Sequence, residues 1–262
     1  PTNPSLEKNN AESSIAVVCL GALGDFILFC SIARELYHAG SRLILICRKE
    51  LGIEEFAALT GYFDRVIALP HQLSRRPGNL RLLKKVKVGS VIVAPAERHI
   101  YSDLCVLALQ GSRRILPDTL QGCSLPSLKR IVDQHVDVLV PVEERYELER
   151  YERYLHGAEI YSGQMEYYTF EWVEANLSER KRQIAIFPGA GGGGIKQWPV
   201  ERFAYVAQNL CDETKSEVLI CGTKGEESLI QTFCRLMPDN VCCVRGSTEL
   251  FELLQQLREC SL

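Results

Sequence analysis

Apolar residues in this chain gather into short uninterrupted runs, and glycine-rich turns and segments with helical spacing separate the runs. Such runs are typical of buried strands in a parallel sheet. They occupy residues 15–20, 42–47, 65–69, 90–94, 113–116, 183–187, 217–221 and 241–244. Helical patterns cover residues 26–37, 52–60, 80–87, 99–109, 143–155, 200–210, a segment that ends at Leu236, and 248–260. Because strands and helices alternate, the sequence predicts an α/β fold with parallel sheets.

The pattern changes in the middle of the chain. Residues 143–155 are strongly charged, and they are most simply a solvated helix with ion pairs between positions i and i+4. An aromatic and polar segment and then a charged segment follow, so a domain boundary is expected there. We predict a disordered leader at 1–14, an N-terminal Rossmann-like domain at 15–160, a linker at 161–182 and a C-terminal domain at 183–262.

Composition and charge exclude several classes of protein. The 262 residues carry 30 Lys and Arg against 33 Asp and Glu, so the net charge of -3 argues against a nucleic-acid partner. No apolar run approaches the roughly 18–20 residues that span a bilayer. The polar N-terminus also lacks the basic start and apolar core of a secretory signal. We therefore expect a cytoplasmic protein without a transmembrane segment.

The eleven cysteines and five histidines do not indicate a metal site. No two cysteines have the C-x-x-C spacing of a zinc or redox site, and the histidines do not have the spacing of metal ligands. Several cysteines lie inside apolar runs, so small buried hydrophobes in a reducing cytosol are favoured over a disulfide framework.

The loop after the first strand is a candidate ligand site. Gly21-x-x-Gly24-Asp25 joins a strand to a helix at the carboxyl edge of the predicted sheet, where open α/β proteins bind ligands. The dinucleotide fingerprint G-x-G-x-x-G is not met, because Leu23 stands where its second glycine belongs. Asp25 has two interpretations of equal weight, helix capping and catalysis.

The loop after the strand at 183–187 is rich in glycine. Gly189–Gly194 satisfies G-x-G-x-x-G, but no acidic residue ends a following strand at the distance that a dinucleotide site needs. It nearly matches the phosphate loop of nucleoside triphosphatases, but Ile195 displaces Lys196 by one position and Gln197 replaces the hydroxyl residue. Glycine N–H groups and a lysine beside a helix start still suit a diphosphate. The alternative is a mobile loop that binds nothing.

Two motifs together resemble the bacterial heptosyltransferases of glycosyltransferase family nine. The first is Leu20-Gly21-Ala22-Leu23-Gly24-Asp25, followed by an apolar helix that ends in Arg34-Glu35-Leu36. The second is Phe187-Pro188-Gly189-Ala190, followed by Lys196-x-Trp198-Pro199-x-Glu201-Arg202-Phe203. The resemblance implies the GT-B architecture, in which two Rossmann-like domains face a cleft. It also implies inverting transfer of heptose from ADP-heptose to the inner core of lipopolysaccharide, without an essential metal or cofactor.

The resemblance implies roles for individual residues. Asp25 would be the general base that deprotonates the acceptor hydroxyl, and Lys196 would bind the donor diphosphate. The other implied donor contacts are Gly189, Ala190, Gly191, Gly222, Thr223 and Glu226. The expected acceptor contacts are Gly24, Arg98 and His99.

The sequence departs from the family in two places. The run Gly191–Gly194 removes side chains that the family often has there, which puts the donor preference in doubt. A later Asp-x-Gly-x-x-His-like segment is also missing, and the second half has three strand patterns where a doubly wound domain has about five or six. We therefore expect an incomplete second domain in a truncated enzyme. The alternatives are a degenerate, non-catalytic binding or scaffold protein and, less favoured, a nicotinamide-dependent dehydrogenase.

If the acceptor is linked to a lipid, the enzyme is expected to act at the inner surface of the cytoplasmic membrane. A cluster of basic side chains offers candidates for contact with anionic lipid headgroups, and a solvated helix face explains the same cluster equally well. Its members are Arg75, Arg76, Arg81, Lys84, Lys85 and Lys87.

Overall fold

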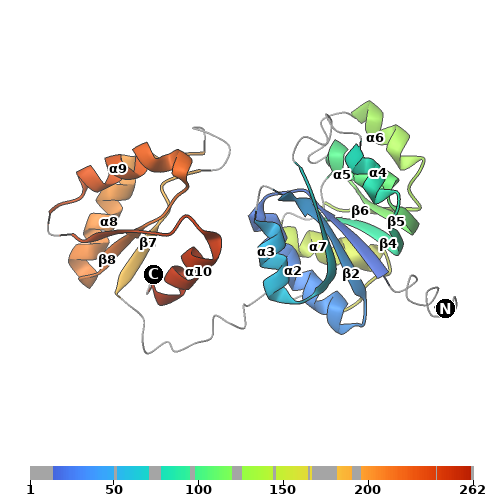
Figure 1. Ribbon diagram of the computed structural model, residues 1–262, viewed down its shortest axis with the longest axis horizontal. Coiled ribbons are helices and arrows are strands. Elements are labelled where there is room, and N and C mark those ends of the chain that lie inside the picture. The colour runs from blue at the N-terminus through green and yellow to red at the C-terminus, as the bar shows by residue number, and fades with distance from the viewer. Residues whose placement is uncertain are drawn as a thin grey trace. The chain divides into compact units, whose positions relative to one another are not determined.

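The computed structural model divides the chain into two compact units, Pro1–Thr169 and Phe170–Leu262 (Figure 1). Each unit is described by itself. The residues that the structure describes are 14–49, 52–70, 78–94, 98–119, 126–143, 146–164, 166, 182–190, 196–239 and 241–260. No helix within these ranges is both long enough and apolar enough to cross a membrane.

The first unit is built on a six-stranded parallel sheet with the order β3-β2-β1-β4-β5-β6. The chain adds strands on one side of β1 and then returns to add the others on the opposite side. This reversal makes the gap between β1 and β4 the topological switch point of the sheet, where open α/β proteins bind ligands. The strands are β1 (Ser14–Cys19), β2 (Arg42–Arg48), β3 (Phe63–Leu69), β4 (Lys87–Ala94), β5 (Gln110–Asp118) and β6 (Val138–Pro141).

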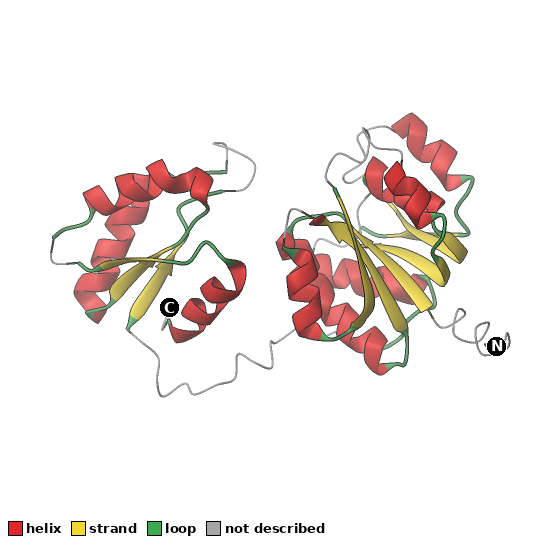
Figure 2. Ribbon diagram, in the orientation of Figure 1, coloured by secondary structure: helices red, strands yellow, loops and turns green. Residues whose placement is uncertain are grey.

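Helices cover both faces of this sheet (Figure 2). Helix α2 contacts α3 and α7, and α5 contacts α4 and α6. All six residues of β1 are buried, as the continuous apolar run predicts for a central parallel strand. The helices are α2 (Leu23–His38), α3 (Ile53–Thr60), α4 (Gly78–Leu83), α5 (Ile100–Ala108), α6 (Pro126–Asp133) and α7 (Glu147–Gly157).

Helix α7 is not the solvated helix that its charge suggests. It buries one face, with Arg150, Tyr151, Tyr154 and Leu155 all inside. The Tyr154 hydroxyl donates to the carbonyl oxygen of Ile115 at 2.6 Å, which ties the helix to β5. Aromatic rings at helical spacing supply most of the buried face, and the charged residues other than Arg150 are more exposed.

Two further expectations differ from the structure. The basic helix predicted at 80–87 ends at Leu83, because Lys87 already belongs to β4 and pairs with Gln110 of β5. The elements α6 and β6 lie in a stretch to which the pattern assigned neither a helix nor a strand. Of the basic candidates, Arg75 and Arg76 lie outside the described residues.

The second unit holds a three-stranded parallel sheet with the order β7-β8-β9. Helices α8 and α9 pack over one hydrophobic cluster, and α10 packs over another that contains Leu219, Cys221 and Cys260. The strand order runs in one direction, as in one half of a doubly wound sheet. The elements are β7 (Gln183–Ile186), α8 (Val200–Thr214), β8 (Glu217–Ile220), the 3₁₀ helix η5 (Lys224–Glu226), α9 (Glu227–Leu236), β9 (Cys243–Arg245) and α10 (Leu250–Glu259).

A buried ion cluster in the first unit is centred on Arg98, which has no exposed surface. Its Nη2 donates to Asp103 Oδ2 at 2.9 Å, and its Nη1 donates to Asp133 Oδ1 at 2.8 Å. Lys129 also binds Asp133, with Nζ 2.8 Å from Oδ2. The cluster joins the segment before α5 to α6. Arg98 is thus a structural residue, and the expectation that it contacts an acceptor is not supported.

The charges in this cluster depend on one another. Burial opposes the charge on Arg98, but the hydrogen bonds to Asp103 and Asp133 outweigh burial and raise its pKa. Burial raises the pKa of Asp103 despite the neighbouring guanidinium. Burial also opposes ionisation of Asp133, yet hydrogen bonds from Lys129 and Arg98 hold its pKa below the ordinary value.

Replacement of Arg98 by methionine is expected to lower the free energy of unfolding by about 3–5 kcal/mol, because Asp103 remains buried without its cation. Denaturant unfolding measures the loss. The exposed Arg130 on α6 provides the control, and Arg130→Met is expected to change stability by about 0.5 kcal/mol or less. Adding Asp103→Asn to the Arg98 variant should restore part of the loss. Equal stability of the two single variants would contradict the structural role.

Candidate active site

The carboxyl end of β1 carries Asp25 at the switch point of the first sheet. Helix α2 begins at Leu23, so Asp25 is its third residue, and its carboxylate reaches back over the first turn. The backbone N–H of Ala22 donates to Asp25 Oδ2 at 2.6 Å. Asp25 therefore satisfies a free N–H group at the helix start, yet its side chain is only half-buried. Capping and contact with a ligand are compatible at this position.

Two neutral groups lie within electrostatic range of Asp25. Burial raises the pKa of the Cys19 thiol, and the negative charge of Asp25 adds to that effect. Burial likewise raises the pKa of the Tyr151 hydroxyl well above its usual range, and Asp25 contributes there too. Both groups consequently stay protonated at neutral pH and add no negative charge beside Asp25.

Gly24 is a glycine that the fold itself does not require. Its φ is not in the left-handed region, and a Cβ built on it meets nothing within 4 Å. Glycine inside a helix costs about 0.5–1 kcal/mol relative to alanine. The open space beside Gly24 lets another molecule approach the backbone next to Asp25.

His99 lies on the same edge of the sheet as Asp25. In the register of β1 and β4, Cys19 lies opposite Ala94, so these two strands end at the same level of the sheet. His99 is the N-cap of α5, is exposed, and accepts a hydrogen bond through Nδ1 from the Tyr101 N–H at 3.4 Å. Gly24, Asp25 and His99 thus share the switch-point edge, whereas Arg98 is buried beneath it.

The second unit has a pocket of about 270 Å³ where its three strands end. The loops after β7, β8 and β9 and the start of α10 form its wall. Four residues that the sequence nominated as donor contacts are in this wall: Gly189, Gly222, Thr223 and Glu226. The other lining residues are Phe187, Cys221, Ser247, Thr248 and Leu253. Phe187 and Cys221 belong to segments that the resemblance had pointed to, whereas Ser247, Thr248 and Leu253 were missed by sequence reasoning.

Glu226 is held at a defined place in this pocket. Its Oε2 accepts from the backbone N–H of Thr223 at 2.7 Å and from the Thr223 hydroxyl at 2.8 Å. A Cβ on Gly189 would collide with Oε1 of this carboxylate, and a Cβ on Gly222 would come within 3.2 Å of Oε2. A side chain at either position would therefore displace the Glu226 carboxylate, which packs directly against the two strand ends.

The charge of Glu226 restricts what this part of the pocket can bind. A fixed carboxylate accepts hydrogen bonds from hydroxyl groups and repels phosphate. A sugar or nucleoside hydroxyl suits the position, whereas a diphosphate has to lie elsewhere. A cation for it is available on the loop after β7, where Lys196 is exposed.

Two of the predicted donor residues, Ala190 and Gly191, are not among the described residues that line the pocket. Ala190 is described but is not in the pocket wall, and Gly191 lies outside the described residues. Trp198, two positions after Lys196, packs edge-on against Phe203 with ring centroids 5.0 Å apart. In the described ranges, no group of three or more His, Cys, Asp or Glu side chains is placed to hold a metal ion.

The chain resembles known glycosyltransferases in sequence and fold. The model of glycosyltransferase family 9 (heptosyltransferase) matches residues 129–262, just over half of the chain. A family 9 glycosyl transferase from Veillonella parvula is 16% identical, with a TM-score of 0.71 over 95% of this chain and 74% of that chain.

Two heptosyltransferases from E. coli have similar structures. WaaC, solved with ADP-2-deoxy-2-fluoro heptose, is 14% identical, with a TM-score of 0.69 over 93% of this chain and 79% of WaaC. The ADP-heptose lps heptosyltransferase II is 18% identical, with a TM-score of 0.62 over 94% of this chain and 74% of that chain. No curated protein matches the sequence.

These likenesses agree with the motifs and with the fold. The solved structures share the two-unit α/β fold and support the GT-B assignment. At these identities they show the fold alone, so the family rests on the match of residues 129–262. The chain belongs to glycosyltransferase family 9, the heptosyltransferase family.

Proposed function

We propose that the protein transfers heptose, or a related sugar, from an ADP-sugar to a lipopolysaccharide-type acceptor with inversion at the anomeric carbon. The observation that carries the proposal is the pocket at the strand ends of the second unit, where Glu226 offers a fixed carboxylate to nucleoside hydroxyls. The family supplies the reaction class. The donor is suggested by WaaC, which was solved with ADP and with an ADP-heptose analogue.

The donor is proposed to bind along the loops that follow β7 and β8. Gly222, Thr223 and Glu226 take the nucleoside, because a carboxylate accepts from ribose hydroxyls. The diphosphate is assigned to Lys196 and the glycine-rich loop with Ala190 and Gly191, whereas Gly189 itself packs against the Glu226 carboxylate. The lysine stabilises the charge that develops on the leaving ADP.

Asp25 is proposed to be the general base. As the acceptor hydroxyl attacks the anomeric carbon, Asp25 takes its proton and the bond to the diphosphate breaks. Attack on the face opposite the leaving group inverts the anomeric centre. The proposal needs no cofactor, because the nucleotide sugar is itself the activated substrate.

The acceptor is proposed to lie over the switch point of the first unit. Gly24 leaves room beside Asp25, and the exposed His99 ring can donate to or accept from a sugar hydroxyl. Anionic lipid headgroups are proposed to contact four exposed basic residues near α4. These residues are Arg81, Lys84, Lys85 and Lys87.

Asp25→Asn is expected to reduce turnover by about 10²–10⁴-fold, because asparagine cannot take a proton at neutral pH. Its side-chain oxygen can still accept from the Ala22 N–H, so the helix start and the affinity for ADP should be preserved. Transfer from radiolabelled ADP-heptose measures turnover, and calorimetry measures binding. Glu55→Gln, in the first turn of α3, is the matched control. Unaltered turnover in the Asp25 variant would exclude the base role.

The variant Gly24→Ala tests whether Gly24 leaves room for the acceptor or is needed for the fold. Alanine is the better helix former, so thermal unfolding should show equal or higher stability, by up to about 1 kcal/mol. The KM for the acceptor is expected to rise about tenfold or more, because the new methyl group fills the space beside Asp25. Normal acceptor kinetics in this variant would remove Gly24 from the acceptor site.

Lys196→Ala and Glu226→Gln should affect different parts of the donor. The lysine variant is expected to bind ADP about tenfold more weakly and adenosine unchanged, because it lacks only the diphosphate contact. The Glu226 variant should bind both ligands more weakly, by about tenfold. Calorimetric titrations measure these affinities, with Lys84→Ala and Glu213→Gln, both at exposed sites, as controls. If the wild-type chain binds neither ADP nor ADP-sugars, the protein is not a donor-binding enzyme.

A further inference from the structure

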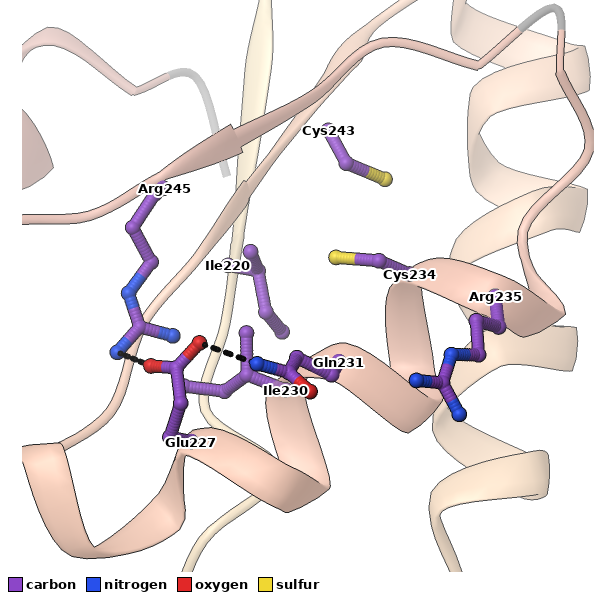
Figure 3. A pocket seen from close by; sticks show the side chains of 8 residues that line it. All are labelled: Ile220, Glu227, Ile230, Gln231, Cys234, Arg235, Cys243 and Arg245. Atoms are coloured by element: carbon purple, nitrogen blue, oxygen red, sulfur yellow. Dashed lines mark hydrogen bonds and ion pairs between the residues drawn. The ribbon is translucent and has the colours of Figure 1, made fainter.

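A second pocket in the C-terminal unit lies between α9 and β9 and has a volume of about 390 Å³. Its wall shares no residue with the pocket proposed for the donor. Side chains from β8, α9 and β9 line it, and Figure 3 shows how they face one another. The lining residues are Ile220, Glu227, Ile230, Gln231, Cys234, Arg235, Cys243 and Arg245.

Two thiols from distant parts of the chain face each other across this pocket. Cys234 is on α9 and Cys243 opens β9, and their sulfur atoms point toward one another (Figure 3). Most of the other described cysteines are buried in the cores, but Cys234 is exposed and Cys243 is only half-buried. The pair is therefore accessible to a reagent in solution, which a core cysteine is not.

The pocket also carries positive charge on both sides of the thiols. Nη2 of Arg245 pairs with Glu227 at 3.1 Å, and Gln231 supports the same carboxylate through Nε2 at 3.2 Å. Nη1 of Arg245 is buried and has no hydrogen-bond partner among the described residues. Arg235 lies on the opposite side of the pocket in Figure 3. One carboxylate against two guanidinium groups favours a small anionic ligand.

We propose that Cys234 and Cys243 are a redox-active dithiol that closes to a disulfide by exchange with a small disulfide carrying carboxylates, of the glutathione type. The Cys234 thiolate attacks one sulfur of the reagent, forms a mixed disulfide and releases the first reagent thiolate. The Cys243 thiolate then attacks the sulfur of Cys234, forms the Cys234–Cys243 disulfide and displaces the second reagent thiolate. The reagent is reduced by two electrons, and the two protons from the cysteines end on the two released thiols.

The position of the dithiol couples it to the proposed donor pocket, and this part of the inference rests on the proposed function. Helix α9 begins directly after Glu226, and β9 runs into Ser247 and Thr248, so both cross-linked elements continue into that pocket. The fit there is tight, because a Cβ on Gly189 or Gly222 would crowd the Glu226 carboxylate. Drawing α9 onto β9 alters this fit, so oxidation should weaken ADP binding.

Peptide mapping by mass spectrometry after treatment of the full chain with oxidised glutathione tests the site. The expected product is a Cys234–Cys243 cross-link that dithiothreitol reverses. Cys243→Ser should instead accumulate glutathione on Cys234, and Cys234→Ser should form neither product. The adjacent exposed Cys242 supplies the matched control, so Cys242→Ser should still form the cross-link. A link from Cys234 to Cys242, or adducts without any link, would overturn the assignment.

The rate of the closing step gives an independent readout. Burial, with the neighbouring Cys234, Cys211 and Cys242 thiols, raises the pKa of Cys243 to about 11. Only the thiolate attacks, so closure from the mixed disulfide should become faster as the pH rises from about 7 to 9. A disulfide that closes in Cys243→Ser at the wild-type rate would show that Cys243 is not the resolving thiol.

Calorimetry with ADP on the reduced and the cross-linked chain tests the coupling. We expect the cross-linked form to bind ADP at least about threefold more weakly, and Cys243→Ser to show no effect of the oxidant. Equal affinities of the two wild-type forms would disprove the coupling. If the reduced chain does not bind ADP, the proposed function fails, while the mapped cross-link still decides whether the dithiol exists.

Discussion

Both sheets consist of parallel strands, and this single constraint places every candidate functional residue. Parallel strands all end at one edge, and each must be followed by a loop that leads into a crossover helix. In the first unit the reversal of strand order puts Asp25 and His99 on the edge between β1 and β4. In the second unit the same rule gathers the loops after β7, β8 and β9 around Glu226.

Arg98 and Asp25, two charged residues of the first unit, differ in burial and in the role that burial allows. Arg98 is completely buried, and it holds α5 and α6 together through Asp103 and Asp133. Asp25 is half-buried, caps its own helix and keeps access to solvent. The difference is physical: burial makes an ion pair necessary for Arg98, whereas a carboxylate at a helix start is stabilised by N–H groups and can still react.

Much of the fold was predictable from local pattern. The runs at 15–20, 42–47 and 90–94 are strands because residues buried on both faces must all be apolar, which leaves a plain signature. The charged segment at 143–155 was misleading, because its aromatic face is buried by packing that the sequence does not reveal. The glycines at 189 and 222, which the resemblance implied as donor contacts, line the pocket, whereas its wall from Ser247 and Thr248 was missed.

The sequence by itself determined the α/β class, the strand-to-helix loops that carry Asp25 and Glu226, and the motifs of the family. These features depend on neighbours in the chain, namely apolar runs, glycine turns and short spacings. Only the tertiary structure decided that Arg98 is buried, that Glu226 fits between two strand ends, and that Cys234 meets Cys243. Crossover connections bring those residues together from distant positions, and no local pattern of residues encodes which side chains will then share a space.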